Sequence, residues 1–179
     1  MTLFYGARQL ADSIRTVRRN TVLISEDISE VDYVFRSTPD SRSVSEILTH
    51  ILFFSHFDRA LQEKKYVTEP GKFDLAKFLK ESESEERKRY SKSELVNLLK
   101  ETGESWAQWV ESLSEDDLSQ QVAQPGGVPK TLFEMILGTK EHEMHHRAQL
   151  TVIERLLGIV PHLTRRRGSA QVAVTKTGS

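Results

Sequence analysis

The sequence contains no cysteine. Disulfide bonds, thiolate metal sites and a cysteine nucleophile are therefore excluded, and we expect a protein of a reducing compartment, the cytoplasm. Any bound metal ion must use nitrogen or oxygen ligands. Long apolar runs are lacking as well: the longest, from Ile51 to Phe54, falls far short of the roughly 20 residues that cross a bilayer. We therefore expect a soluble protein with no membrane partner.

Neither sign of charge is in excess. Lysine and arginine total 25, and aspartate and glutamate total 26. Proteins that hold nucleic acid need a strongly basic surface, so this balance disfavours a nucleic-acid partner. The length of 179 residues suits one domain of ordinary size. We expect a bundle domain at residues 1–160 and a flexible C-terminal tail at residues 161–179.

Helical periodicity dominates the chain, and no strand of convincing length is predicted. Apolar residues recur at alternating steps of three and four within residues 3–28, 43–63, 91–113 and 131–157. This spacing places them on one face of a helix in each segment. The sequence therefore predicts four long amphipathic helices.

Capping signals mark three of the helix starts. At each of them a serine or threonine is followed three residues later by glutamate, so that each side chain accepts from the backbone N–H of the other residue. These pairs are Ser43 with Glu46, Ser91 with Glu94, and Thr131 with Glu134. Gly158 and then Pro161 provide the stop for the last helix.

Residues 64–90 form a long connection between the second and third helices. It contains Pro70-Gly71, a charge run at residues 80–89 and a possible short helix around residues 73–79. We interpret the charge run as a solvated face with no further role. A connection of this length allows the helices on either side of it to run parallel. The predicted fold is an all-α four-helix bundle with a long crossover between helices 2 and 3.

Three of the six histidines lie close together on the fourth helix. At about 100° per residue, His146 lies about 40° from His142, and Gln149 lies about 20° on the other side of His142. These three residues therefore share one face, which the apolar pattern turns toward the core. His145 lies about 60° from His142 in the opposite sense from His146, at the flank of that face.

A third imidazole is available from the second helix, where His50 lies on the apolar face. Two histidines four residues apart on a helix can bind one ion, and a third ligand must then come from another element. Buried imidazoles need partners for their nitrogens, and convergence on a cation provides them. We predict one divalent metal ion held by His50, His142 and His146, with at least one open coordination position. Zinc is the ion expected from ligand type, although nickel, manganese and iron also accept imidazole.

A bundle with hydrogen-bonded histidines and no metal is the competing interpretation. His50 alone is more typical of a core-edge histidine with a backbone partner than of a ligand. Glu46, one turn before His50, is interpreted as a helix cap rather than a fourth ligand. His56 points away from His50, by about 240°, and His162 lies beyond the stop of the last helix.

Two stretches of the sequence, residues 43–50 (SVSEILTH) and 142–149 (HEMHHRAQ), resemble the DinB/YfiT-like superfamily of metal-dependent bundles. The order of elements is similar to that family from about residue 7 to residue 157. The chain departs from the family at Arg42, where many members carry tryptophan, and at Ala148, where glycine is common. Neither departure removes a ligand.

The resemblance implies a four-helix bundle that holds its metal between helices 2 and 4, often as a homodimer. It favours His146 over His145 as the ligand beside His142. Members that resemble this chain include metal-dependent transferases and isomerases that use bacillithiol, mycothiol or glutathione. We therefore expect a thiol S-transferase that acts on small electrophiles in detoxification or stress, with a small-molecule thiol and an electrophile as partners. A metal-dependent hydrolase and a non-catalytic metal-binding stress-response bundle remain open, because no separate general acid or base is evident.

Overall fold

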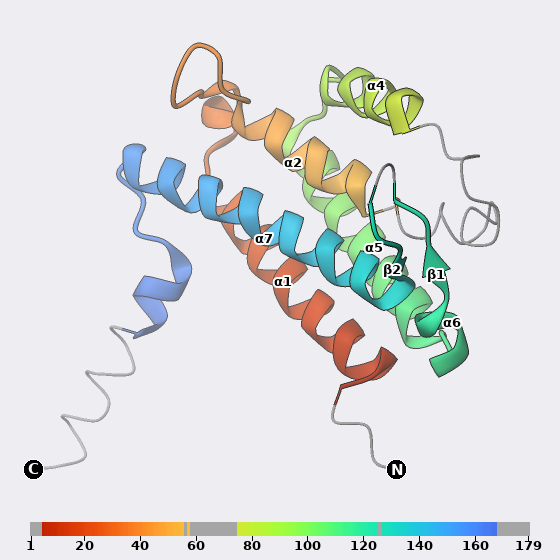
Figure 1. Cartoon of the computed structure of the whole chain (residues 1–179). Helices are drawn as coiled ribbons and strands as arrows, with labels where there is room; N and C mark the ends of the chain where they lie inside the picture. The colour runs from red at the N-terminus through yellow and green to blue at the C-terminus, as the bar shows by residue number, and fades with distance from the viewer. Residues whose placement is uncertain (1–4, 56, 58–74, 125–126, 168–179) are drawn as a thin grey trace, which may run out of the picture.

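The four amphipathic segments form four long helices that lie side by side (Figure 1). The computed structural model describes residues 5–55, 57, 75–124 and 127–167. The long helices are α1 (Ala7–Asp27), α2 (Val44–Phe54), α5 (Lys92–Glu111) and α7 (Leu132–Leu156). Figure 1 shows α1 and α7 running in one direction and α2 and α5 in the opposite one. The protein is a four-helix bundle, as the sequence predicted, and its second and third long helices run parallel.

Within the described residues, five smaller elements lie between the long helices. They are the 3-10 helix η1 (Glu30–Val34), α4 (Leu75–Glu86), α6 (Glu115–Ser119), β1 (Gln121–Val122) and β2 (Lys130–Thr131). The two strands pair antiparallel, with Gln121 opposite Thr131. Strands of this length carry no detectable alternation of apolar and polar residues, which is why the sequence did not predict them. The hairpin leads the chain directly into α7.

The predicted capping boxes all form. Ser43, Ser91 and Thr131 cap α2, α5 and α7, and in each case the glutamate three residues later closes the reciprocal bond. At the end of α7, Gly158 takes a left-handed conformation with φ of 78°, which glycine adopts at little cost. The start and the end of α7 therefore agree with the prediction.

Two helices differ from the predicted bounds. The second helix was expected to run to about residue 63, but α2 ends at Phe54, where the N–H of Ser55 bonds back to Ile51. Residues 58–63 lie outside the described part of the chain. The short helix expected around residues 73–79 is α4, which extends to Glu86 and so includes much of the charge run.

The core consists of two apolar clusters stacked along the bundle. One cluster joins the end of α1, η1 and α2 to the first half of α5 and the end of α7. Its largest fully buried members are Ile24, Ile28, Leu48, Ile51, Leu95, Leu99 and Leu150. The other joins the start of α1 to the end of α5 and the start of α7, with Leu10, Ile14, Leu132 and Ile136 fully buried. These clusters fix the faces that α2 and α7 turn toward each other.

A buried ion pair crosses the middle of the bundle. Arg18 of α1 and Glu143 of α7 are each 3% exposed, and their side chains meet at 3.0 Å. Thr21 also donates to the Glu143 carboxylate, and Arg18 donates to the carbonyl of Leu99. Gly103 of α5 makes room for Arg18, because a Cβ there would lie 2.3 Å from Arg18 Cγ. This network fixes the rotation of α7 about its axis at the residue that follows His142.

The first part of the expected C-terminal tail packs against the bundle. Residues 162–167 are helical, His162 bonds to Asn20, and Arg165 pairs with Asp27. Residues 168–179 lie outside the described part of the chain. None of the helices in the described ranges combines the length and the apolar character that crossing a membrane requires.

Candidate metal centre

Helices α2 and α7 bring His50, His142 and His146 together. The Nε2 atom of His142 lies 3.1 Å from Nε2 of His50 and 3.1 Å from Nε2 of His146. One nitrogen from each ring falls within 4.8 Å of the other two. His50 and His146 are each 6% exposed. The antiparallel packing of α2 on α7 thus gathers the three residues that the sequence singled out.

The opposite nitrogens of two of these rings are already occupied. His50 Nδ1 lies 2.6 Å from a carboxylate oxygen of Glu86, and His146 Nδ1 lies 2.9 Å from the amide oxygen of Gln149. Both oxygens accept hydrogen bonds, so each Nδ1 carries the proton and each Nε2 keeps a bare lone pair. Glu86 and Gln149 therefore set the tautomers in which the Nε2 atoms are free to bind a cation.

The surroundings of His142 and His146 keep these two rings neutral. Burial, followed by the neighbouring His146 and His50 rings, lowers the pKa of His142 to about 3. Burial also lowers the pKa of His146 to about 4. Burial raises the pKa of Glu86, but hydrogen bonds from His50 and then Arg42 outweigh it and lower that pKa to about 2. Near neutral pH the rings of His142 and His146 are therefore uncharged, and Glu86 is a carboxylate.

This donor set fits a divalent metal ion. The Nε2 atoms of His50 and His146 each lie 3.1 Å from Nε2 of His142, and a cation held among the three rings can take one lone pair from each. Imidazole nitrogen suits zinc, nickel and iron. Glu86 bonded to the far nitrogen of His50 is the carboxylate–histidine arrangement that accompanies histidine ligands in metal sites. The residues present are therefore those that a three-histidine centre requires.

The role of Glu86 was missed at the sequence level, where it lay in a charge run interpreted as a solvated face. Its side chain is only 10% exposed and also pairs with Arg42 at 2.7 Å. The solvated-face interpretation is therefore wrong for this residue. No local pattern distinguishes Glu86 from the acidic residues around it, because its role depends on how α4 returns to the N-terminal half of α2.

The remaining candidates lie at the edge of the site or away from it. His145 is exposed and contacts Gln149, in agreement with its predicted flank position. Gln149 was expected to face the core, but it is exposed and reaches His146 from the rim. Glu46 closes the cap of α2 and pairs with Arg36. His56 lies outside the described residues.

Two cavities lie near the histidine cluster: His142 lines one of them, and Gln149, which bonds to His146, lines the other. A cavity of about 200 Å³ is bordered by His142, Phe54, Phe57 and Gly138, and is mainly apolar. The ring of Phe54 stacks 4.3 Å from that of His142, between centroids, and 4.6 Å from that of His50. Toward the start of α2 a larger cavity of about 580 Å³ is lined by a polar set that includes Asp40, Ser41, Arg42 and Gln149.

Comparison with known proteins agrees with this architecture. The family model of the DinB superfamily matches residues 13–150. Among solved structures, a DinB-like protein from Bacillus subtilis (YjoA) shares 23% identity with a TM-score of 0.62, covering 84% of this chain and 92% of its own. YfiT from Bacillus subtilis, described as a probable metal-dependent hydrolase with an unusual four-helix bundle topology, shares 17% identity with a TM-score of 0.67, covering 89% and 91%.

An uncharacterised protein from Clostridium difficile 630 shares 14% identity with a TM-score of 0.69, covering 86% of this chain and 98% of its own. No curated protein matches the chain. At these identities the solved structures establish a common fold. The family match extends over most of the chain and includes all three histidines of the cluster, and the chain belongs to the DinB superfamily.

Proposed function

We propose that the protein is a divalent-metal-dependent thiol S-transferase that acts on small electrophiles in detoxification or stress response. The observation that carries the proposal is the convergence of the ring nitrogens of His50, His142 and His146 on one point between α2 and α7. A divalent ion held there would lower the pKa of a thiol or water that reaches it and so supply a nucleophile at neutral pH. Zinc is the ion that three imidazoles favour, with nickel, manganese and iron as alternatives.

The two cavities beside the histidines support a reaction between two substrates. The smaller cavity, walled by Phe54 and Phe57, suits the apolar body of an electrophile. The larger one offers charge of both signs from Arg42 and Asp40, which suits the zwitterionic part of an amino-acid-derived thiol. The smaller cavity reaches the cluster at His142, and the larger one reaches it through Gln149, which bonds to His146.

Arg42 is the residue best placed to recognise an anionic thiol. Its Nε and Nη2 atoms bond to the Glu86 carboxylate, and its Nη1 atom has no partner among the described residues. Its positive charge is close enough to contribute to the lowered pKa of both His142 and His146. A thiol whose carboxylate pairs with Arg42 is thereby held beside the histidines.

A metal-dependent hydrolase is the second candidate, favoured by the description of the similar structure YfiT. The same three ligands serve either reaction, and a hydrolase needs a site for one organic substrate only. A metal-binding bundle without catalysis is the third, because Glu86, the carboxylate in contact with the cluster, is already held by His50 and Arg42. We also propose a homodimer located in the cytoplasm, on the basis of the family resemblance and of the cysteine-free composition.

The enzyme class is tested with a panel of thiols. Zinc-loaded wild type and the His146→Ala variant are incubated with glutathione, bacillithiol or mycothiol and a chromogenic electrophile, and in parallel with a chromogenic ester without thiol. Thiol consumption by the wild type alone supports the transferase. Ester hydrolysis without any thiol consumption supports the hydrolase instead, and inactivity in both assays supports the non-catalytic bundle.

The recognition of the thiol is tested by Arg42→Gln. For a carboxylate-bearing thiol such as glutathione, KM rises by about tenfold or more, as expected for the loss of one charge-assisted hydrogen bond. For 2-mercaptoethanol, which has no carboxylate, KM stays within about twofold. An equal rise for both thiols would mean that Arg42 acts through Glu86 and not through the substrate.

A further inference from the structure

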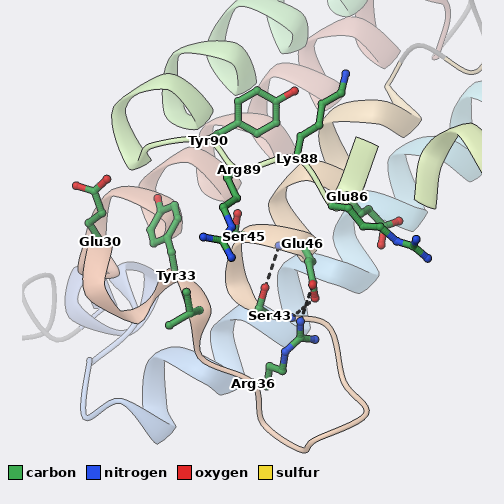
Figure 2. A pocket seen from close by; sticks show the side chains of 12 residues that line it. Glu30, Tyr33, Arg36, Ser43, Ser45, Glu46, Glu86, Lys88, Arg89 and Tyr90 are labelled. Carbon is green, nitrogen blue, oxygen red and sulfur yellow. Dashed lines mark hydrogen bonds and ion pairs between the residues drawn. The ribbon is translucent and has the colours of Figure 1, made fainter. Parts of the chain in front are cut away.

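A separate cavity of about 490 Å³ lies between η1, the first turn of α2 and the link from α4 to α5 (Figure 2). It shares the Glu86 side chain with the histidine cluster but contains none of the three histidines. Its volume is within the range of about 300–1,000 Å³ that small-molecule sites occupy. Nothing in the reaction proposed above uses this cavity.

The carboxylates that border the cavity are already engaged. Glu46 pairs with Arg36 and accepts from the backbone of Ser43, and Figure 2 shows these contacts at one end of the cavity. Glu86 is held by the ring of His50 and by Arg42. These negative charges are thus largely neutralised before any ligand arrives.

Two arginines of the cavity, Arg87 and Arg89, are available to a ligand. Both line the cavity, and neither forms an ion pair or hydrogen bond within the described part of the chain. Figure 2 shows Arg89 reaching inward toward Ser45, whereas Lys88 extends away from it. Glu30, on the far rim, accepts from the backbone N–H of Lys92. The interior of the cavity therefore has an excess of positive charge.

Two tyrosines also line the cavity. Tyr33 is 4% exposed, and its hydroxyl is committed to the carbonyl of Ser25, so its ring is fixed in place. Tyr90 is partly buried and packs against the same apolar cluster as Tyr33. Ser45, from the first turn of α2, adds a hydroxyl near Arg89. Tyrosine rings accept flat apolar groups, and an arginine beside a hydroxyl accepts an oxyanion.

We propose that this cavity binds a small organic oxyanion, a carboxylate or phosphate ester that carries a flat apolar group. Arg89 and Arg87 are its cationic anchors, the Ser45 hydroxyl is a hydrogen-bond donor, and the rings of Tyr33 and Tyr90 contact the apolar part. The site is distinct from the histidine cluster and does not depend on the reaction that occurs there.

The proposal is tested on the full-length zinc-loaded chain with three probes: benzoate, phenyl phosphate and the uncharged benzyl alcohol. Affinity is measured by calorimetry, and the place of binding is read from backbone amide shifts in ¹⁵N-labelled protein. The variants are Arg89→Gln and Ser45→Ala. The matched control is Arg8→Gln, which removes an exposed arginine at the start of α1, far from the cavity.

At least one of the two anions is expected to bind with a stoichiometry of one, to shift the amides of Ser45 and Arg89, and to bind about tenfold or more weakly to Arg89→Gln. The anion that binds more tightly identifies the natural headgroup. Arg8→Gln is expected to stay within about twofold of the wild type. The proposal is overturned if neither anion saturates, if benzyl alcohol binds equally well, if Arg8→Gln weakens binding as much as Arg89→Gln, or if the shifts centre on His146.

Discussion

The carboxylate of Glu86 lies 2.6 Å from Nδ1 of His50 and so connects the end of α4 to a candidate metal ligand. The contact holds the His50 ring with Nε2 directed at the other two histidines. Loss of such a carboxylate partner typically costs a metal site about 10- to 100-fold in affinity. Replacing Glu86 therefore changes metal affinity without removing a ligand.

We predict that Glu86→Gln binds zinc about 10- to 100-fold more weakly than the wild type. Competition with a chromogenic chelator measures the affinity. Glu83→Gln is the control, because Glu83 is exposed on the same helix. If both variants bind zinc as the wild type does, then Glu86 has no part in the site.

The buried ion pair leads to a prediction about stability. Arg18→Met leaves the Glu143 carboxylate buried without its partner, and we expect unfolding to require about 3–5 kcal/mol less free energy. The double variant Arg18→Met with Glu143→Leu removes both charges and recovers most of that loss. Urea unfolding measures all of these values.

Arg15→Met is the matched control for that series. Arg15 forms an ion pair with Glu104 of α5, but the Arg15 side chain is 29% exposed. We expect this variant to lose no more than about 1 kcal/mol. If Arg15→Met and Arg18→Met lose similar amounts of unfolding free energy, then burial of the Arg18–Glu143 pair has no energetic consequence.

Replacing two glycines on long helices by alanine is expected to change stability in opposite directions. In Gly103→Ala the new methyl group would lie 2.3 Å from Arg18 Cγ, and the displacement of this buried side chain costs about 1–3 kcal/mol. In Gly138→Ala the methyl group meets no atom within 4 Å, and the better helix propensity adds about 0.5–1 kcal/mol. Thermal unfolding measures the stability of both variants. A loss of stability in Gly138→Ala as large as that in Gly103→Ala would contradict the prediction.

The buried side chain of Glu154 is expected to make the stability of the fold depend on pH. This side chain is fully buried and has no hydrogen-bond partner within the described residues. Burial, and then the charge of Asp27, raises the pKa of Glu154 to about 7, although Arg165 and Arg155 oppose the shift. Between about pH 4.5, the value for the unfolded chain, and about pH 7, only the folded protein keeps this proton. The fold therefore loses stability as pH rises through that window.

We expect Glu154→Gln to gain stability relative to the wild type between pH 5 and pH 8, by about 2–3 kcal/mol. The measurement is the urea midpoint of both proteins at the two pH values. Glu141→Gln, an exposed position on the same helix, is expected to show no such change. A difference between Glu154→Gln and the wild type that is the same at pH 5 and pH 8 would contradict the assigned pKa.

The bundle was predictable from the sequence because the patterns that indicate its helices lie within each helical segment. Apolar spacing located α1, α2, α5 and α7, and the capping boxes gave the first residues of three of them. The cluster of three histidines was also accessible, since His142 and His146 share a helix face and His50 is a polar residue on an apolar one. These features need no knowledge of how distant segments pack.

The residues that support the site were not predictable in the same way. Arg18, Glu86 and Glu143 appear in the sequence as ordinary charged residues, and only the packing of α1, α4 and α7 buries them. Helical periodicity reports which face is apolar on average, and a buried charge is indistinguishable from an exposed one by that measure. Their roles arise from contacts between segments far apart in the chain.

Elemental analysis measures whether His50, His142 and His146 bind one divalent ion. The proteins are purified without a nickel column, loaded with zinc and dialysed, and the comparison is between wild type, His146→Ala and His145→Ala. His145 is the matched control because it is the adjacent histidine but lies exposed at the flank.

We predict about one equivalent of metal in the wild type and in His145→Ala, as expected for a single site, and a loss of nearly all of it in His146→Ala. Equal metal content in the wild type and in His146→Ala would mean that the three histidines do not hold the ion.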